Sequence, residues 1–563
     1  MSSHKILNIS IPDPKLQDKL SSSLGISRIT SQILINRGIK SLKEAGNFLD
    51  PRLDQLLDPF SFSDMRLAVN LIKKSARNKD RVLVHGDYDV DGVTSLVLLT
   101  QTLRKLGLEA EHYIPHRIKE GYGLGRNIIK ILKEKKIGLF ITADCGTNSV
   151  EIIEEIKGQG IEVIITDHHE PSTTASYGWP VINPKISGSG YKYRDLAGVG
   201  VAFKLCQALT GSFLEDDLDL VCLGTICDSV PLTGENRVIS KLGLEKIAES
   251  ERPGLKALIQ AAGINNKKMT QEFVGFILGP RINASGRMDT AETAFDLLMC
   301  DDEIKAAHLA KTLDTYNRQR QKVESEIMEE AQDLINKEVN FKEHQVMVVA
   351  KEGWHLGVLG VVASKLADRF YRPAILISIN QGLCRGSGRS IKNFHLFEGL
   401  NDSKELLDGF GGHEHAIGMV IQQDNISQFR DKINLFAKDK LVFQDLIPSL
   451  DVDMELGLAD IGREFILELG KLEPFGEGNA RPLFYTRDLM LKGQPRLFNK
   501  NTMKFWVTDN DLTYSAIGFG MGQLKGELLN AGSFGLVYSP MIDNWQGQES
   551  MILDIKEIFF KTR

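Results

Sequence analysis

The stretch Ile161-Glu-Val-Ile-Ile-Thr-Asp-His-His-Glu170 decides the fold of this chain. Its β-branched and apolar residues end abruptly at Asp167, His168 and His169. A short run of Val and Ile closed by polar residues is typical of a strand buried on both faces of a parallel sheet. The polar residues then lie at the carboxyl end of the strand, where open α/β sheets bind their ligands. Two imidazoles beside a carboxylate suit a divalent cation such as Mn²⁺ or Zn²⁺, and a polar strand-to-loop exit is the plainer alternative.

An earlier strand, expected at residues 82–84, ends in the same manner. It is followed by a histidine and by three carboxylates at alternate positions: His85, Asp87, Asp89 and Asp91. Carboxylates this close together repel one another strongly unless a cation lies among them. An EF-hand calcium loop is excluded, because its twelfth position, counted from Asp87, is Leu98 instead of Glu.

Two further carboxylates are candidates for the same site. The segment 136–146 repeats the format of a strand followed by Asp144 and a glycine turn. Because the carboxyl ends of parallel strands meet at one edge of a sheet, the sequence predicts a metal site there. Asp228 stands alone in the apolar segment 218–232, and a buried lone carboxylate needs a partner. A metal ion, an arginine or a helix terminus would each supply one.

The length and composition indicate the number of domains, the cellular location and the kind of ligand to expect. The length of 563 residues suggests about three or four domains. No stretch approaches the roughly 18 apolar residues of a membrane helix, and the first residues lack the apolar core of a secretory signal. The six cysteines form no CxxC pair, so we expect a cytoplasmic location without structural zinc or disulfides. A net charge of −6 disfavours a surface that binds nucleic acid everywhere, but it leaves room for a local basic groove.

Two later regions are predicted to bind phosphate: segment 280–287, and segments 385–390 and 411–415 of a second α/β domain. Segment 280–287 is expected to be a glycine-bounded loop suited to phosphate oxygens, with a salt-bridged surface loop as the alternative. Segment 280–287 is followed by a long charged helix at 302–339. A second α/β domain comes next, with strands at 345–350 and 374–379 and a helix at 360–370. His413 and His415 of that domain are weaker candidates for a metal site. The predicted substrate-binding residues are Arg281, Asn283, Ser285, Arg287, Arg385, Ser387, Arg389, Gly411, Gly412 and His413.

From about residue 446 the pattern changes to short strands separated by turns. Five strands predict an OB-type barrel, a fold that holds single strands by stacking bases on aromatic rings. The candidates for stacking are Phe505, Trp506, Tyr538 and Trp545, although an aromatic residue of a barrel is more often part of its core.

These motifs resemble those of the DHH phosphoesterase family, and most closely its bacterial members that degrade single-stranded DNA. The resemblance extends over nearly the whole chain. It rests on segments 33–38, 86–92, 167–169, 279–288 and 411–416, together with the strand end at Asp144 and the segment around Asp228. The implied architecture is α/β, with a parallel-sheet DHH domain, a second α/β domain and an OB-type barrel. The implied boundaries are a helical lead-in at 1–80, the DHH catalytic domain at 81–300, a linker helix at 301–340, the DHH-associated domain at 341–445 and the barrel at 446–563.

The resemblance also assigns roles. It implies that one or two Mn²⁺ or Mg²⁺ ions are ligated by five residues: Asp89, Asp91, Asp144, His168 and Asp228. His85 corresponds to a metal-ligating histidine of related phosphatases, and Asp87 is an additional carboxylate of the first motif. Asp144, His168 and His169 are the predicted catalytic residues. The position of Asp144 between the other ligands favours it as the carboxylate that bridges the ions, and His169 is expected either to support a ligand from behind or to face substrate.

The resemblance implies a 5′→3′ exonuclease of single-stranded DNA that acts by two-metal-ion catalysis in DNA repair and recombination. It implies a monomer with no membrane attachment, and a single-strand-binding protein and a helicase as partners. One alternative is a phosphodiesterase of short oligonucleotides or cyclic dinucleotides, whose relatives generally lack the barrel. The other is a non-catalytic DNA-binding scaffold, which the intact set of candidate ligands disfavours.

Overall fold

The computed structural model describes residues 5–121, 123–172, 177–380, 382–499, 501–545 and 548–560. The chain forms two units, each with a core of its own. Unit 1 comprises Met1–Leu56, Pro231–Lys241 and Pro448–Arg563, and unit 2 comprises Leu57–Val230 and Leu242–Ile447. In the described part of the chain, no helix combines the length and the apolar character needed to cross a membrane.

A five-stranded sheet in the order β3-β2-β4-β5-β6 forms the first part of unit 2. Its strands are β2 (Arg81–Gly86), β3 (Glu109–Tyr113), β4 (Ile137–Ala143), β5 (Glu162–Thr166) and β6 (Val181–Ile182). All neighbouring strands run parallel, which confirms the predicted parallel sheet. The carboxyl ends of β2, β4, β5 and β6 therefore lie along one edge.

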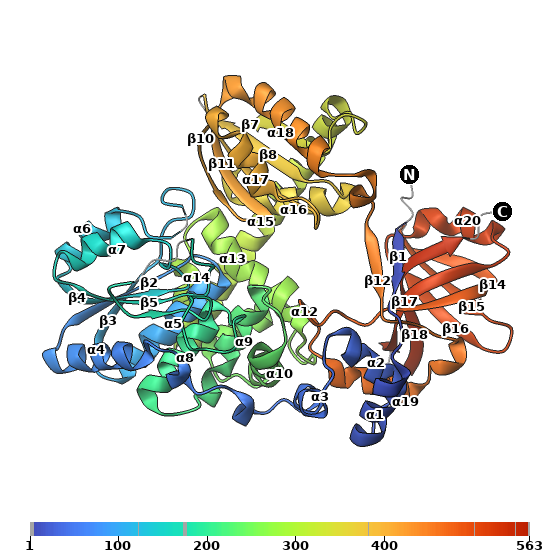
Figure 1. Cartoon of the computed structure of the whole chain (residues 1–563), viewed down its shortest axis with the longest axis horizontal. Coiled ribbons are helices and arrows are strands. Elements are labelled where there is room, and N and C mark those ends of the chain that lie inside the picture. Colours follow the sequence, from blue (N-terminus) through green and yellow to red (C-terminus); the bar gives the residue numbers. More distant parts are fainter. Residues whose placement is uncertain are drawn as a thin grey trace. The chain divides into compact units, whose positions relative to one another are not determined.

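Helices cover both faces of this sheet (Figure 1). They are α4 (Met65–Asn78), α5 (Val90–Lys105), α6 (Asn127–Glu134), α7 (Val150–Lys157) and α8 (Gly198–Thr210). Because alternate residues of a strand point to opposite faces, Leu83, Phe140 and Ile165 pack in one core with α6 and α7. Burial of both faces explains why the strands read as nearly continuous apolar runs.

Further helices follow this sheet along the chain, most of them wholly within unit 2. They are α9 (Leu218–Cys227), α10 (Gly234–Ala248), α11 (Pro253–Ala261), α12 (Gln271–Phe273), a π-helix at Val274–Leu278, α13 (Gly279–Met288), α14 (Glu292–Leu298) and the long α15 (Glu303–Glu338). The expectation of a loop at 280–287 was wrong, since α13 occupies it. Its glycines serve close packing instead of a turn: a Cβ on Gly279 would lie against the Cys227 sulfur, and one on Gly286 against the backbone of Tyr88.

The second α/β part of unit 2 contains a five-stranded sheet in the order β10-β11-β9-β8-β7. Only β7 and β8 of this sheet are parallel, and the other pairs are antiparallel. The elements are β7 (Met347–Glu352), α16 (Leu356–Phe370), β8 (Ala374–Asn380), β9 (Leu383–Arg389), α17 (Leu396–Asp402), β10 (Leu407–Gly412), β11 (Ala416–Gln422) and α18 (Ile426–Lys440). The predicted second α/β domain is thereby confirmed.

The C-terminal part of unit 1 is a closed barrel (Figure 1). Its sheet has the order β13-β14-β15-β16-β18-β17, and an additional pairing of β14 with β17 closes it, as the OB-type prediction requires. The elements are β12 (Ser449–Val452), β13 (Met454–Glu455), α19 (Arg463–Leu469), β14 (Phe484–Phe498), β15 (Thr502–Thr508), β16 (Thr513–Gly518), α20 (Lys525–Asn530), β17 (Phe534–Trp545) and β18 (Gln548–Phe560).

The N-terminal segment of unit 1 shares a core with the barrel. It contains β1 (Ile6–Ile9), α1 (Pro14–Leu24), α2 (Arg28–Asn36) and α3 (Leu42–Leu49). Strand β1 pairs in parallel with β12, and Ile33 and Phe48 belong to the same buried cluster as Phe484. The buried Arg237 ties the parts together by donating to the carbonyls of Phe48, at 2.6 Å, and of Leu472, at 2.9 Å.

Candidate functional site

The carboxyl edge of the parallel sheet collects the predicted metal donors. Asp89 caps the N-terminus of α5 by accepting from the Gly92 N–H at 3.0 Å, and Asp91 lies in the first turn of that helix. Asp144 directly follows β4, and Asp228 caps the C-terminus of α9. The local packing requires glycine at Gly198 of α8, because a Cβ there would lie 2.5 Å from Asp144 Oδ1.

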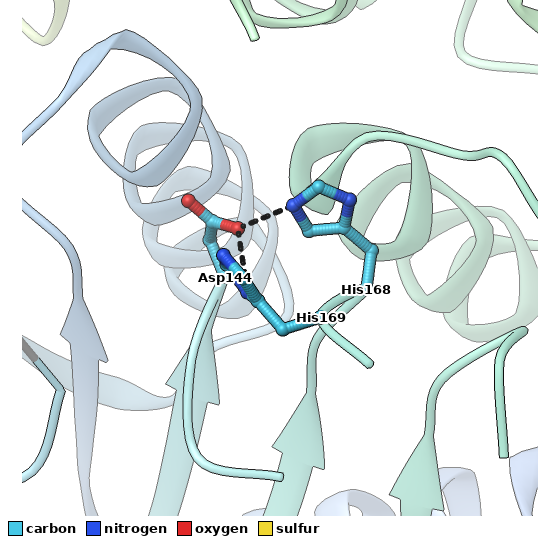
Figure 2. A group of neighbouring side chains, drawn as sticks. All are labelled: Asp144, His168 and His169. Carbon is cyan, nitrogen blue, oxygen red and sulfur yellow. Dashed lines mark ion pairs between the residues drawn. The ribbon is translucent and has the colours of Figure 1, made fainter. Parts of the chain in front are cut away.

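Oxygen and nitrogen donors gather in three overlapping groups at this edge. The ligand atoms of each group lie within 4.8 Å of one another: Asp87, Asp89 and Asp144; Asp144, His168 and His169; and Asp91, His168 and Asp228. Asp144 and His168 each belong to two groups, so they connect the others. Figure 2 shows both imidazoles turned toward one oxygen of Asp144, with His168 Nε2 at 3.2 Å and His169 Nδ1 at 3.9 Å from Oδ1.

The unsatisfied atoms of this cluster fit a bound cation. Asp144 Oδ1, Asp228 Oδ2 and both ring nitrogens of His168 are buried without a hydrogen-bond partner among the described residues. Buried polar atoms of folded proteins are normally satisfied, so each of these atoms needs an explanation. Adjacent ligands of an octahedral cation at about 2.1 Å lie about 3 Å apart. His168 Nε2 stands at comparable distances from Asp144 Oδ1, at 3.2 Å, and from Asp228 Oδ2, at 3.6 Å.

The electrostatics of the cluster favour a cation as well. Burial, reinforced by neighbouring carboxylates, raises the pKa of Asp91 and of Asp144 well above the ordinary value. Burial and the charge of Asp89 raise the pKa of Asp87 to about 8. Ionised carboxylates this close together destabilise the fold, and divalent cations among them would reverse that effect.

Manganese is expected to stabilise the protein more at pH 8 than at pH 6. In the metal-free fold, the raised pKa of Asp87 means that the folded state holds a proton which the unfolded chain releases above about pH 4. The stability of the metal-free protein therefore falls as the pH rises toward 8. Bound Mn²⁺ replaces that proton. Thermal unfolding at both pH values, with EDTA and with Mn²⁺, measures the difference, and a shift in Tm that is equal or smaller at pH 8 would contradict it.

Asp167 positions the two histidines. Its carboxylate accepts from the backbone N–H groups of Thr147, His168 and His169 at 2.9, 2.7 and 3.0 Å, and it lies 2.8 Å from His169 Nδ1. Despite its burial, the hydrogen bond to His169 lowers the pKa of Asp167, and the same contact raises the pKa of His169 to about 9 against the effect of burial. We did not predict this role from the sequence, although Asp167 stands inside the motif that signalled the site.

His85 is not a member of the three donor groups. Its Nδ1 is 3.6 Å from the Cys145 sulfur, and its ring packs against Tyr113 and Phe140. Burial lowers the pKa of His85 to about 4, so the imidazole is neutral near pH 7. The predicted metal contact of His85 stays a prediction.

A cleft of about 370 Å³ is lined in part by Tyr88, which stands between Asp87 and Asp89 in the sequence. Tyr88, Arg117, Arg385 and Ser387 are among its lining residues. The Arg117 guanidinium lies over the Tyr88 ring, 4.7 Å from its centroid, and no feature of the sequence identified Arg117. Arg385 donates to the Ile118 carbonyl at 3.0 Å.

Arg287 and Arg389 contact residues that line the same cleft as Arg117. Arg287 donates to the Gly357 carbonyl at 2.9 Å, and Arg389 donates to the Ser387 hydroxyl at 3.4 Å. Burial, together with the positive charges of Arg117, Arg320 and Arg389, lowers the pKa of Arg287. Burial and the charge of Arg117 likewise lower the pKa of Arg389. We call Arg117, Arg287 and Arg389 the arginine cluster. Mutual repulsion of this kind is relieved by a bound anion, for which guanidinium groups are well suited.

The other predicted substrate residues have different environments. Arg281 is paired with Asp314 of α15 at 3.0 Å, and its predicted contact with substrate stays a prediction. Asn283 accepts from the Val90 N–H at 3.2 Å at the start of α5, and the buried Ser285 donates to the Ile282 carbonyl at 2.6 Å. The remaining three are exposed and are not among the lining residues of the cleft: Gly411 and Gly412 at the end of β10, and His413 directly after it.

The barrel separates the aromatic candidates of the sequence. Phe505 and Tyr538 are buried in its core, whereas Trp506 is 51% exposed. The side chain of Trp545 lies outside the described residues. Lys492 of β14 is the direct cross-strand partner of Trp506, and Lys504 lies two residues away on the same face of β15. An exposed indole flanked by ammonium groups is the combination with which barrels of this type stack bases and hold phosphates.

Comparison with known proteins gives three family matches. The N-terminal domain of the DHH family matches residues 81–225, the DHHA1 domain matches residues 343–439, and the RecJ OB domain matches residues 452–557. The single-stranded-DNA-specific exonuclease RecJ of Bacillus subtilis is 38% identical over 549 residues, which cover 97% of this chain and 70% of the relative. The Haemophilus influenzae RecJ is 32% identical, with 92% of this chain and 93% of the relative covered.

Solved structures agree with these matches. The crystal structure of RecJ in complex with Mn²⁺ from Thermus thermophilus aligns with a TM-score of 0.87 and 26% identity, covering 100% of this chain and 81% of that chain. A crystal structure of exonuclease RecJ bound to manganese aligns with a TM-score of 0.61 and 32% identity, covering 69% of this chain and 100% of that chain. The donor groups described above thus occur in a fold that binds manganese in similar proteins.

Proposed function

The chain belongs to the RecJ family of metal-dependent, single-stranded-DNA-specific exonucleases, and we propose that it degrades DNA from the 5′ end with two Mn²⁺ or Mg²⁺ ions. The observation that supports two ions is the sharing of Asp144 and His168 between the overlapping donor groups. Asp87, Asp89 and Asp144 form one candidate site, and Asp91, His168 and Asp228 form the other.

The residues of the chain have separate tasks in this proposal. Two cations, when bound, lower the pKa of a water molecule and stabilise the attacking and leaving oxygens. Asp144 belongs to the first site and lies 3.2 Å from His168 of the second, so it would link the two sites. Asp167 holds the backbone that carries His168 and His169, so both imidazoles keep their orientation. His169 is partly exposed, which suits a hydrogen bond from its second nitrogen to a phosphate oxygen of the substrate.

The arginine cluster is proposed to hold the terminal phosphate of the strand. A terminal phosphate has a second pKa near 6 and carries almost two charges at neutral pH, whereas an internal phosphodiester carries one. Three guanidinium groups therefore favour an end over the interior of a strand. Arg117 is close enough to the metal donors that its charge lowers the pKa of Asp87, against the larger effect of burial. An end held there would present a nearby phosphodiester to the metal donors.

A nuclease assay with end-labelled DNA tests the proposal. With Mn²⁺ or Mg²⁺, a 5′-labelled single strand is expected to release its label as short products from the start of the reaction. A 3′-labelled strand should shorten progressively, and a blunt duplex should remain intact. EDTA should abolish both reactions. Release of the 3′ label first would refute the proposed polarity, and full activity in EDTA would refute the metal mechanism.

We propose that Trp506 stacks on bases of the bound strand. Substitution of Trp506 by alanine is expected to weaken the binding of a long single strand by about 10-fold, because stacking on one base contributes about 1–3 kcal/mol. Fluorescence anisotropy with a labelled oligonucleotide measures the loss. Phe519, which is also exposed, supplies the matched control as Phe519→Ala. Equal binding by wild type and Trp506→Ala would exclude the indole from the DNA path.

We further propose the cellular setting that the family resemblance implied. The enzyme would work as a monomer in the cytoplasm, in DNA repair and recombination. A helicase would supply single strands, and a single-strand-binding protein would be a second partner. The barrel and the intact donor groups favour this setting over a phosphodiesterase of short oligonucleotides and over a scaffold without activity. Co-purification with either partner, together with sedimentation of the free enzyme, would test these proposals.

A further inference from the structure

Lys185 lies at the same sheet edge as the metal donors, and nothing in its sequence context marks it as functional. It follows β6 by three residues, and β6 is the parallel neighbour of β5, which ends at the histidine pair. The Asp167 N–H donates to the Ile182 carbonyl at 3.1 Å, so the two strand ends are directly joined. The lysine therefore belongs to the row of strand ends that carries Asp144 and His168.

The buried Asn183 fixes the backbone of Lys185 relative to the histidines. Its Oδ1 accepts from the Lys185 N–H at 2.9 Å. Its Nδ2 donates to the His169 carbonyl at 2.9 Å and to the Thr147 hydroxyl at 2.9 Å. One side chain thus connects the segments after β4, β5 and β6, and the position of Lys185 depends on the geometry of the site.

The ammonium of Lys185 has only a weak partner in the described structure. It stands 3.6 Å from Glu170 Oε1, and the Lys185 side chain is 22% exposed whereas that of Glu170 is 61% exposed. A long, solvated ion pair of this kind contributes little and exchanges easily.

We propose, on the basis of the proposed function, that Lys185 leaves Glu170 when DNA binds and donates to a non-bridging oxygen of the scissile phosphate. Arg117 lines the cleft beside Tyr88, which stands between Asp87 and Asp89 in the sequence, whereas Asn183 ties Lys185 to the segment of the histidine pair. A phosphate at the metal donors would then meet protein cations on both flanks. A lysine is suited to this place, because its compact ammonium adapts to one oxygen on a flexible stem.

Three variants distinguish a substrate contact from a structural ion pair. Lys185→Met is expected to lower kcat on single-stranded DNA by about 10- to 100-fold, the scale of losing one hydrogen bond to a charged group. Lys185→Arg should retain most of the activity, because it keeps the charge. Glu170→Gln should be at least as active as wild type, since it frees the ammonium. Lys192→Met, an exposed lysine seven residues away, is the matched control.

Single-turnover rates and Mn²⁺ affinity by calorimetry give the readouts. The Mn²⁺ affinity of Lys185→Met should stay within about twofold of that of wild type, while its single-turnover rate of DNA hydrolysis falls. Equal losses in Lys185→Met and Glu170→Gln would assign the lysine to the ion pair and overturn the inference. Undiminished activity of Lys185→Met beside an active wild type would also overturn it. An inactive wild-type protein would refute the proposed function itself, and with it the inference.

Discussion

Replacement of Asp144 by asparagine is expected to lower the rate of DNA hydrolysis by about 10³-fold or more, a scale typical of removing a member of a catalytic unit. Asp144 is shared by two of the three donor groups, and its Oδ1 is buried without a hydrogen bond among the described residues. Asparagine keeps the shape of the side chain but removes the charge that would attract both cations. Binding of single strands should change little, because Asp144 belongs to neither the arginine cluster nor the barrel.

Thermal unfolding of the Asp144→Asn variant provides a second test of the role of Asp144. Loss of one negative charge from a buried, repelling cluster should raise the Tm of the metal-free protein and reduce the additional stabilisation by Mn²⁺. Asp216→Asn, at a fully exposed position of unit 2, is the matched control for both measurements. An Asp144→Asn variant that hydrolyses DNA within tenfold of wild type would exclude Asp144 as the connecting ligand.

The metal site could be predicted from the sequence because its candidate ligands follow strands in consecutive βα units. Val and Ile runs mark the strands, and strand ends of a parallel sheet meet at one edge. Contacts between distant segments leave no such periodic signal. The core that Ile33 shares with Phe484 is an example, and so is the place of Arg117 in the arginine cluster. Neither contact follows from residues near it in the sequence.

The barrel shows a second limit of sequence patterns. Phe505 and Trp506 are adjacent in β15, and alternate residues of a strand face opposite sides. The pattern therefore predicts that one ring is buried and the other exposed. Which ring is buried depends on the register of β15 against β14 and β16, which is set by the packing of the whole core.

The shared core also affects the design of experiments on the barrel. Removal of residues 446–563 would leave the apolar faces of α1, α2 and α3 without their partners in the core of unit 1. Loss of function in such a truncated chain would mix unfolding with loss of DNA binding. The single substitution Trp506→Ala leaves that core intact, because the indole is on the outer face of the barrel.

Loss of the arginine cluster is expected to have the second-largest effect. We expect each of the variants Arg117→Met and Arg389→Met to lower kcat/KM on 5′-phosphorylated single strands by about 10- to 100-fold. Removing a hydrogen bond to a charged group costs about 1.5–3 kcal/mol, and each 1.36 kcal/mol corresponds to a factor of about ten. Arg287 is less suitable for this test, because it donates to the carbonyl of the distant Gly357 at 2.9 Å, whereas the backbone contact of Arg389 is to the adjacent Gly388 at 2.7 Å.

The dependence on the strand end makes this test specific. If the cluster holds a terminal phosphate, the loss in both variants should be large on 5′-phosphorylated strands and small on strands with a 5′-hydroxyl. Wild type should prefer the phosphorylated end, and the variants should lose that preference. Arg369→Met, at the exposed C-terminal turn of α16, controls for the loss of a surface charge. An equal loss on both kinds of end would mean that the guanidinium groups contact internal phosphates, and the end preference of the enzyme would then have another origin.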